Sequence, residues 1–297
     1  MDLNQLLQLA GDSEPYAEHL TETTPDVRKR VRALKKLQIE SFKVEAEFYK
    51  RIEQLQIEFQ PRYDAVNTKR AAIIAGTHEP VEEECKVPLL SNMPEAELKE
   101  LEEQWDNGNA TKESVTGIPK FWLDTLRQVS GINDLIQDHD VKILEHLVDI
   151  KNIMEDNSFT LEFHFSPNEY FSNEVLSKTY ATSNEINEED PFDYEGPYVV
   201  GAKGTEIQWK GGNQVPLAHS VFGFFYPQVT SIPKDADSDE HDAMIDILRE
   251  DFSLGQIIRD QVIPRAVLYY TGEIDDQDGF DPESMMEDSF EDEDMDD

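Results

Sequence analysis

The feature that most constrains the fold of this chain is a helical pattern that runs from Pro25 to about Gly76. Thr24 is suited to cap such a helix, and Pro25 is suited to its first turn. A helix of about 50 residues is about 75 Å long, more than the width of any core that 297 residues can build. Apolar residues recur along it at intervals of three, four, seven or fourteen positions, all of which keep to one helix face, at Val27, Val31, Leu34, Phe48, Ile52, Leu55, Phe59, Val66 and Ile73.

Much of this apolar stripe must be covered by a second helix, most simply by the same helix of a second copy. Gln38 and Glu45 interrupt the stripe, which favours an irregular helix pair over a regular coiled coil. Pro61 predicts a kink or break. We therefore expect a homodimer whose contacts include Val31, Leu34, Phe42, Phe48, Ile52, Leu55 and Phe59.

The rest of the chain predicts an α+β domain with an antiparallel β-sheet covered by helices. Helical patterns are expected at 92–104, 119–126, 138–150, 239–250 and 253–263. Strands are expected at 159–165, where apolar and polar residues alternate, and at 175–182, 207–210 and 221–226. The expected organisation is an acidic, partly disordered segment at 1–24, the dimerisation helix and a turn at 25–88, the α+β domain at 89–272 and a disordered acidic tail at 273–297.

The charge of the chain indicates the kind of partner it binds. The formal net charge is −38, and no Lys or Arg follows Arg265. This excess of acid exceeds what solubility requires, so it predicts a strongly basic partner. It argues against direct binding to nucleic acid or to an anionic membrane.

The acidic residues form three groups that nothing basic nearby neutralises. We expect them to share one surface that steers a basic protein into contact. The candidate binding residues are Glu185, Glu188, Glu189, Asp190 and Asp193 in the first group, Asp235, Asp237, Asp239, Glu240 and Asp242 in the second, and Asp275, Asp276 and Asp278 in the tail.

No motif indicates catalysis, a cofactor or a metal. The sequence has no Walker loop, no dinucleotide fingerprint and no His-Glu-x-x-His motif. The acids around Gly279 do not fit a calcium loop, because Met285 stands where a bidentate Glu is needed. Cys85, the only cysteine, lies beside acids that disfavour a thiolate. The N-terminus lacks the pattern of a signal peptide, which predicts a protein of the cytosol or the nucleus.

A basic cluster, from Arg28 to Lys36, lies near the start of the long helix. Its residues fall between those of the apolar stripe, so a solvated helix face is the simplest interpretation. A nuclear import signal is the alternative, because such a cluster can also resemble one.

Several segments resemble the nucleosome assembly protein family of histone chaperones, and its founding branch more than its shorter relatives. They extend in order over about residues 25 to 272. They are Val31–Gln38, Glu79–Cys85, Ile118–Leu123, Leu161–Phe171, Asp190–Phe192 and Ile263–Gly272.

The resemblance implies a long antiparallel dimerisation helix joined to an α+β domain, two copies forming a curved dimer. It also implies a protein that binds core histones, mainly the outer histone dimer of the nucleosome, and that shuttles histones and removes non-nucleosomal histone–DNA contacts. Nuclear import receptors are implied as further partners, with shuttling between the nucleus and the cytoplasm.

One segment departs from the family pattern. Family members carry a basic hairpin, with an import signal and contacts between dimers, between the segments that match 208–210 and 222–225. Here residues 211–220 cross that gap without a basic run, so the resemblance alone does not carry either of these hairpin properties over to this chain.

Two other functions remain open. The family includes regulatory adaptors, such as a phosphatase inhibitor or a carrier that hands histones to an import receptor. The acidic tail alone would also suit an ion buffer.

Overall fold

The computed structural model describes residues 17–109, 115–233 and 238–274. The chain divides into two compact units, which are described separately below. Unit 1 comprises Met1–Ile52 and Asn184–Pro197, and unit 2 comprises Glu53–Ser183 and Tyr198–Asp297. The expected disorder of 1–16 and of the tail concerns residues outside the described ranges.

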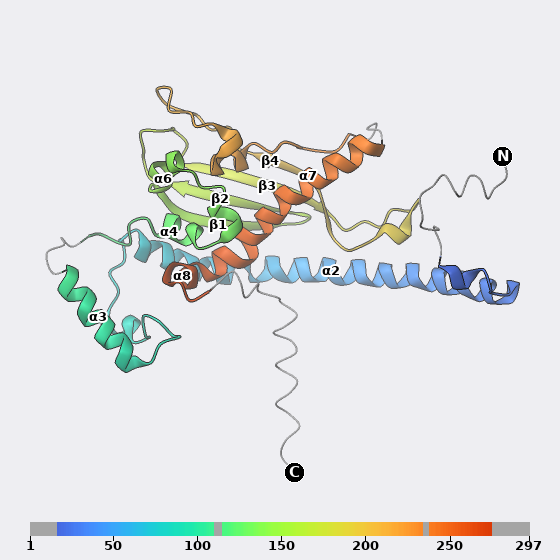
Figure 1. The fold of residues 1–297 in the computed structure, drawn as a ribbon, viewed down its shortest axis with the longest axis horizontal. Coiled ribbons are helices and arrows are strands. Elements are labelled where there is room, and N and C mark those ends of the chain that lie inside the picture. Colours follow the sequence, from blue (N-terminus) through green and yellow to red (C-terminus); the bar gives the residue numbers. More distant parts are fainter. Residues whose placement is uncertain (1–16, 110–114, 234–237, 275–297) are drawn as a thin grey trace, which may run out of the picture. The chain divides into compact units, whose positions relative to one another are not determined.

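The long helix α2 spans Pro25–Ile74, as the apolar spacing predicts, and contributes residues to both units (Figure 1). At its start, the backbone N–H of Val27 lies 3.4 Å from the Thr24 hydroxyl, which caps the first turn. The helix continues through Pro61, so the chain does not break there.

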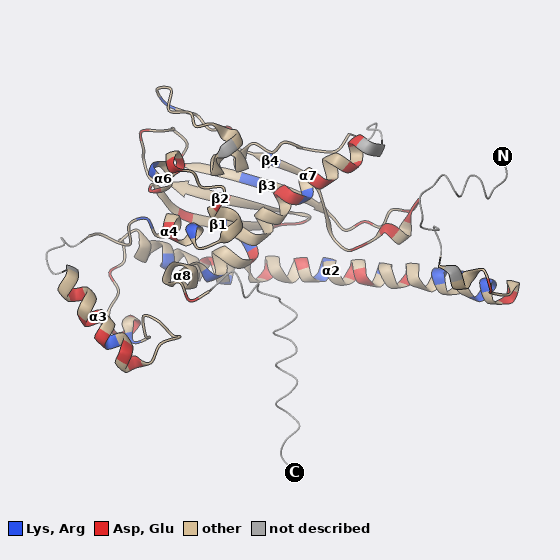
Figure 2. Cartoon of the chain, in the orientation of Figure 1, with Lys and Arg blue, Asp and Glu red and all other residues tan. Residues whose placement is uncertain are grey.

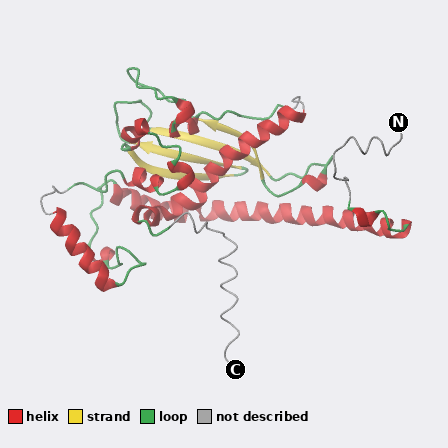
Figure 3. Ribbon diagram, in the orientation of Figure 1, coloured by secondary structure: helices red, strands yellow, loops and turns green. Residues whose placement is uncertain are grey.

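Unit 2 contains a four-stranded antiparallel sheet in the order β1-β2-β3-β4 (Figure 3). The strands are Leu147–Glu155 (β1), Ser158–Phe165 (β2), Val175–Ser183 (β3) and Tyr198–Gly204 (β4). In β2 every second residue is buried, because successive side chains point to opposite faces. The predicted α+β fold with a helix-covered sheet is confirmed.

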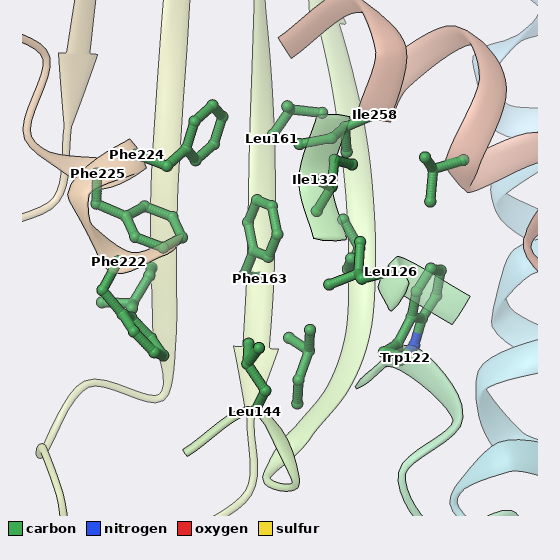
Figure 4. Packing of buried hydrophobic residues seen from close by; sticks show 14 of the residues in the cluster. Trp122, Leu126, Ile132, Leu144, Leu161, Phe163, Phe222, Phe224, Phe225 and Ile258 are labelled. Carbon is green, nitrogen blue, oxygen red and sulfur yellow. The ribbon is translucent and has the colours of Figure 1, made fainter. Parts of the chain in front are cut away.

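The core of unit 2 lies between one face of this sheet and several helices (Figures 1 and 4). Leu161 and Phe163 of β2 pack there with Trp122, Leu126 and Ile258 from the helices. Besides α2, the described residues form the helices α3 (Glu95–Asn109), α4 (Phe121–Arg127), α5 (Ser130–Asn133), α6 (Asp138–Leu144), α7 (Ser238–Ile257), the π-helix η6 (Ile258–Val262) and α8 (Ile263–Thr271). They also form the short 3₁₀ helices η1 (Glu18–Leu20), η2 (Glu82–Cys85), η3 (Pro191–Asp193), η4 (Leu217–His219) and η5 (Val221–Phe225).

An ion pair between a buried lysine and a half-buried aspartate fixes α7 to the sheet. Lys178 of β3 is fully buried, and its Nζ lies 2.9 and 2.8 Å from the two carboxylate oxygens of Asp251. It also donates to the carbonyl of Phe224 at 2.6 Å. Burial lowers the pKa of the Lys178 ammonium, and the Asp251 carboxylate opposes that effect. The pair therefore joins α7, β3 and η5.

Four sequence predictions of local structure are wrong. The predicted helix 138–150 ends at Leu144, and its last residues begin β1. The predicted strand 221–226 is the 3₁₀ helix η5, in which a side chain at Gly223 would meet the carbonyl oxygen of Leu217 at 2.3 Å. Residues 207–210 form only an isolated bridge at Trp209, and the fourth strand is instead β4. The helices predicted at 239–250 and 253–263 belong to one run, α7 followed by η6.

Candidate acidic binding surface

The first acidic group lies on the connection between β3 and β4, which belongs to unit 1. All five of its candidate residues are exposed: Glu185, Glu188, Glu189, Asp190 and Asp193. Glu195 is exposed as well. None of Glu188, Glu189, Asp190 and Asp193 forms a salt bridge with a described residue. These carboxylates therefore present uncompensated negative charge to solvent.

Hydrogen bonds fix the acidic connection to α2 within unit 1. The amide of Asn184 donates to the carbonyl of Ala46 at 2.6 Å. The Tyr194 hydroxyl in turn donates to the Asn184 side-chain oxygen at 2.6 Å. Tyr194 is buried, and this burial, reinforced by the nearby Glu45 carboxylate, raises the pKa of its hydroxyl. The connection is thus held at both ends of its acidic stretch.

Aromatic contacts complete this attachment. The rings of Phe42 and Tyr194 lie 5.8 Å apart. Gly196 adopts a φ of +100°, and a side chain there would meet the Tyr49 ring at 3.3 Å, so glycine suits this position in both conformation and space. Phe192 remains exposed between Asp190 and Asp193, and the Lys35 ammonium lies 4.1 Å from the centre of its ring.

The second acidic group lies at the start of α7 in unit 2. Glu240 and Asp242 are exposed there, and Asp242 lies 3.7 Å from His241. Asp239 is in the helix, although its side chain is not described, and Asp235 and Asp237 lie outside the described residues.

Acidic residues that the sequence analysis did not select extend this group. Asp246 and Glu250 are exposed on α7 and continue the spacing of Asp242 by one turn each. Figure 2 shows acidic residues at several places along this helix. That spacing of four is visible in the sequence. Helix α3 carries a further set of exposed acids, Glu95, Glu97, Glu100, Glu103 and Asp106.

The tail candidates Asp275, Asp276 and Asp278 lie outside the described residues, but the residue that leads into them is fixed. The Glu273 carboxylate accepts the backbone N–H of Ser91 at 2.6 Å and the Thr271 hydroxyl at 2.6 Å, and it also accepts the Ser91 hydroxyl. The hydrogen bond from the Ser91 hydroxyl is the largest cause of a lowered pKa at Glu273.

The predicted dimerisation residues divide into two sets along α2. Val31, Phe42 and Phe59 are half-buried by their own chain. Leu34, Phe48, Ile52 and Leu55 are exposed. Leu37, Val44, Tyr63 and Val66 are exposed large apolar residues of the same helix. At about 100° per residue, the four exposed residues of the predicted set and these four additional residues all fall within about 100° of one another around the helix axis. Together the eight form one uncovered apolar face.

This exposed face is symmetric along the helix. Taken from its ends inwards, the pairs are Leu34 with Val66, Leu37 with Tyr63, Val44 with Leu55 and Phe48 with Ile52. The two residue numbers of each pair add to 100, or to 99 for Val44 with Leu55, so the pattern is centred close to residue 50.

Other features of the described residues do not form a second kind of site. Asp140 is buried, but it accepts hydrogen bonds from the Ser220 hydroxyl at 2.6 Å and from the Val221 backbone at 3.1 Å, so it fixes α6 to η5. Within the described ranges no group of three His, Cys, Asp or Glu residues is arranged to hold a metal ion. No helix there has the length and apolarity needed to cross a membrane.

The fold is that of solved nucleosome assembly proteins. A malaria parasite nucleosome assembly protein superposes with a TM-score of 0.53 over 85% of this chain and 99% of its own, at 24% identity. A second structure, of the nucleosome assembly protein from Plasmodium falciparum, gives a TM-score of 0.51 over 84% and 100%, at 25% identity.

The sequence comparisons define the family more closely. The sequence model of the nucleosome assembly protein (NAP) family matches residues 29–219 and 215–273. Nucleosome assembly protein 1-like 1-A of Xenopus laevis is 38% identical over 93% of this chain and 76% of its own length. Human nucleosome assembly protein 1-like 1 is 39% identical over 85% and 71%. The chain therefore belongs to the nucleosome assembly protein family, as the sequence motifs predict.

The two parts of the family match meet at residues 215–219, within the segment that lacks the basic run. In the structure this segment begins with a turn at Gly211 and Gly212, both with positive φ. Lys210 is engaged locally, because its ammonium donates to the carbonyl of Asn168 at 2.8 Å.

Proposed function

We propose that this protein is a histone chaperone that binds core histones through its acidic surfaces, without catalysis. The observation that carries the proposal is the set of exposed carboxylates on the connection of a nucleosome assembly protein fold, of which Glu188, Glu189, Asp190 and Asp193 form no salt bridge with a described residue. Hydrogen bonds and aromatic contacts hold this connection on α2, so its charges stand at defined positions rather than on a free segment.

The proposed mechanism is competition for the histone surface that DNA uses. Carboxylates replace phosphates at basic side chains, and each exposed charge pair contributes only about 0.2–1 kcal/mol. Such contacts are too weak to displace DNA from a nucleosome, but many together dissolve disordered histone–DNA aggregates. They act over about 8 Å at physiological ionic strength, so binding should weaken with salt.

We assign the specificity of binding to Glu185–Asp193 and to the segment from Asp235 to Asp242, and a tuning of affinity to the tail. The proposed partner is mainly the outer histone dimer of the nucleosome. Direct nucleic-acid binding is not part of the proposal, because the net charge of −38 opposes it. Nuclear and cytoplasmic shuttling with import receptors completes the proposed role.

We also propose that the active form is a homodimer joined by α2. The exposed apolar face supports this, because a stable single chain rarely leaves such a continuous stripe in water. Its symmetry about residue 50 favours an antiparallel pair, in which a two-fold axis brings Leu34 of one copy level with Val66 of the other and Phe48 level with Ile52.

Titration calorimetry with refolded outer histone dimers at near-physiological salt tests the histone-binding role. The test variant removes four charges from the connection, by Glu188→Gln, Glu189→Gln, Asp190→Asn and Asp193→Asn. The matched control removes four exposed charges from α3, by Glu97→Gln, Glu100→Gln, Glu103→Gln and Asp106→Asn.

We expect the wild-type protein to bind, the connection variant to bind about tenfold more weakly, a loss of about 1.4 kcal/mol, and the α3 variant to bind nearly as well as wild type. An absence of binding would refute the role. So would binding that an unrelated polyacid reproduces in full. Recovery of a different protein from lysate, with no binding to purified histones, would instead support the regulatory-adaptor alternative.

A further inference from the structure

The one concentration of positive charge in this acidic chain lies at the start of α2. Between Val27 and Ile39 the sequence contains six basic residues and no acid. Five of them fall within about 120° of one another around the helix at about 100° per residue, and all five are exposed. We call them the basic patch: Arg28, Lys29, Arg32, Lys35 and Lys36.

The position of the basic patch is electrostatically unfavourable for α2 alone. The N-terminus of a helix carries about half a positive charge, so cations in the first turns oppose it. No described carboxylate forms a salt bridge with any residue of the patch. The Arg28 guanidinium donates to the carbonyl of Thr23, and the Lys35 ammonium lies over the Phe192 ring, but neither of these two partners carries a negative charge. The patch is therefore suited to an anionic partner.

The chain itself contains a segment of matching charge outside the described residues. From Asp275 to Asp297 it has 13 acidic residues and no Lys or Arg among 23 positions. We call this segment the acidic tail. Nucleic acid would match the patch equally well in sign, but the net charge of −38 repels it from the molecule as a whole.

The antiparallel dimer proposed above brings the two segments near each other. With the two-fold axis at residue 50, residues 28 and 36 of one copy lie level with residues 72 and 64 of the other. Arg70 lies between residues 64 and 72 of α2, within unit 2, and donates to the carbonyl of Ile263 in α8 at 2.5 Å. Helix α8 ends at Thr271, four residues before the acidic tail begins.

The length of the tail allows this contact. Twenty-three residues extend at most about 75–80 Å. Within one chain, residues 36 and 70 are separated by about 51 Å of α2, whereas in the antiparallel pair the patch of the second copy lies level with the helix segment that contacts α8. The effective concentration of a tethered segment is highest when its mean length matches the distance to be spanned, so the contact between copies is favoured.

We propose that the basic patch of one copy binds the acidic tail of the second copy. This inference rests on the proposed antiparallel dimer. It assigns the patch a regulatory role, because a tail held on the patch is withdrawn from a basic partner, and a bound histone competes with the patch for the same carboxylates.

Zero-length carbodiimide cross-linking of the full chain tests this contact, because it joins a lysine amine to a carboxylate that touches it. Equal amounts of ¹⁴N- and ¹⁵N-labelled protein are mixed, exchanged and cross-linked, and mass spectrometry identifies the joined peptides. Sedimentation of the same sample reports whether it is dimeric. The test variant Arg28→Glu with Arg32→Glu keeps Lys29, Lys35 and Lys36 as reporters. The control variant Arg127→Glu with Lys203→Glu makes the same change of charge at exposed sites of unit 2.

We expect mixed-isotope links between the patch lysines and the acidic tail, reduced about tenfold in the test variant and unchanged in the control. Links of a single isotope only would overturn the proposal, as would tail links spread evenly over all exposed lysines. A dimer without patch links would refute the tail contact and leave the dimer intact, whereas a monomeric sample would refute both. Binding of the patch to duplex DNA, with no tail links, would also overturn it.

Discussion

The two units of this chain are stabilised in different ways. Unit 2 has a continuous core in which Trp122, Ile150, Leu161 and Phe222 are completely buried. In the described part of unit 1, the only large side chain that is buried is Tyr194, whereas Leu34, Leu37, Val44 and Phe48 are each at least 58% exposed. The difference indicates that unit 2 is stable through its own core, whereas unit 1 leaves large apolar side chains of α2 uncovered. In the proposed function, a second copy covers the apolar face of α2 and a basic protein covers the acidic connection.

The largest effect is expected at the apolar face of α2, to which unit 1 contributes Phe48 and unit 2 contributes Leu55. Phe48→Asp with Leu55→Asp places four charges in the symmetric interface, two from each copy. Burial of these side chains contributes about 2 kcal/mol each, so association should weaken by about 8 kcal/mol and sedimentation should show monomers or insoluble protein.

The matched control for this variant is Gln54→Asp with Gln56→Asp, which adds the same charge at exposed positions outside the apolar face. It should remain dimeric. A monomeric wild-type chain would contradict the dimer directly.

The next largest effect is expected on the stability of unit 2, when an interaction in its interior is removed. Asp251→Ala leaves the Lys178 ammonium buried without its carboxylate, which should cost about 3–5 kcal/mol in the free energy of urea unfolding. Replacing the pair by Lys178→Met with Asp251→Leu should cost less than the single change. The neighbouring exposed Glu250→Ala should change stability by less than about 0.5 kcal/mol. An Asp251→Ala protein as stable as wild type would show that the ion pair does not hold α7.

A smaller effect tests how the acidic connection is held. Tyr194→Phe keeps the ring against Phe42 but removes the hydrogen bond to Asn184. Such a bond contributes about 1 kcal/mol, so amide hydrogen exchange should accelerate about fivefold in residues 185–193 and remain unchanged in β2. Equal exchange in both proteins would mean that the bond does not fix the connection.

The smallest effect concerns pH. Hydrogen bonds from Ser91 and Thr271 lower the pKa of Glu273 in the folded protein. A carboxyl group with a lowered folded pKa stabilises the protein above its unfolded pKa, and this contribution is lost as the pH falls through the folded pKa. Glu273→Gln should therefore lower the urea midpoint slightly at neutral pH and make no difference in acid. A difference that grows as the pH falls would contradict this assignment.

The sequence predicts those elements whose apolar period is unambiguous. The spacing in α2 and the alternation in β2 each indicate one structure, and both are confirmed. The run Val221–Phe225 is apolar throughout and buried on several sides, so its period cannot distinguish a strand from the 3₁₀ helix that forms. Strand β4 contains two glycines that the close approach of Thr230 and Phe225 requires, and these weaken its strand pattern.

The candidate site is less predictable than the fold, because a sequence gives the charges but not their contacts. The acids of the connection are visible as a run, yet their attachment depends on Asn184, Tyr194 and Gly196, which become meaningful only beside α2. Similarly, the apolar period of α2 does not reveal which residues their own chain covers. Phe42 packs on Tyr194, whereas Phe48 remains exposed.

The most direct test of the proposed antiparallel dimer is a covalent link between two copies of α2. In a Cys85→Ser background, Leu34→Cys and Val66→Cys are introduced together and treated with a short bifunctional maleimide. An antiparallel pair should give a covalent dimer in which residue 34 of one copy is joined to residue 66 of the other. Either substitution alone should give single chains, because two copies of residue 34 would lie about 48 Å apart. A covalent dimer formed by Leu34→Cys alone would instead indicate a parallel pair and refute the antiparallel dimer.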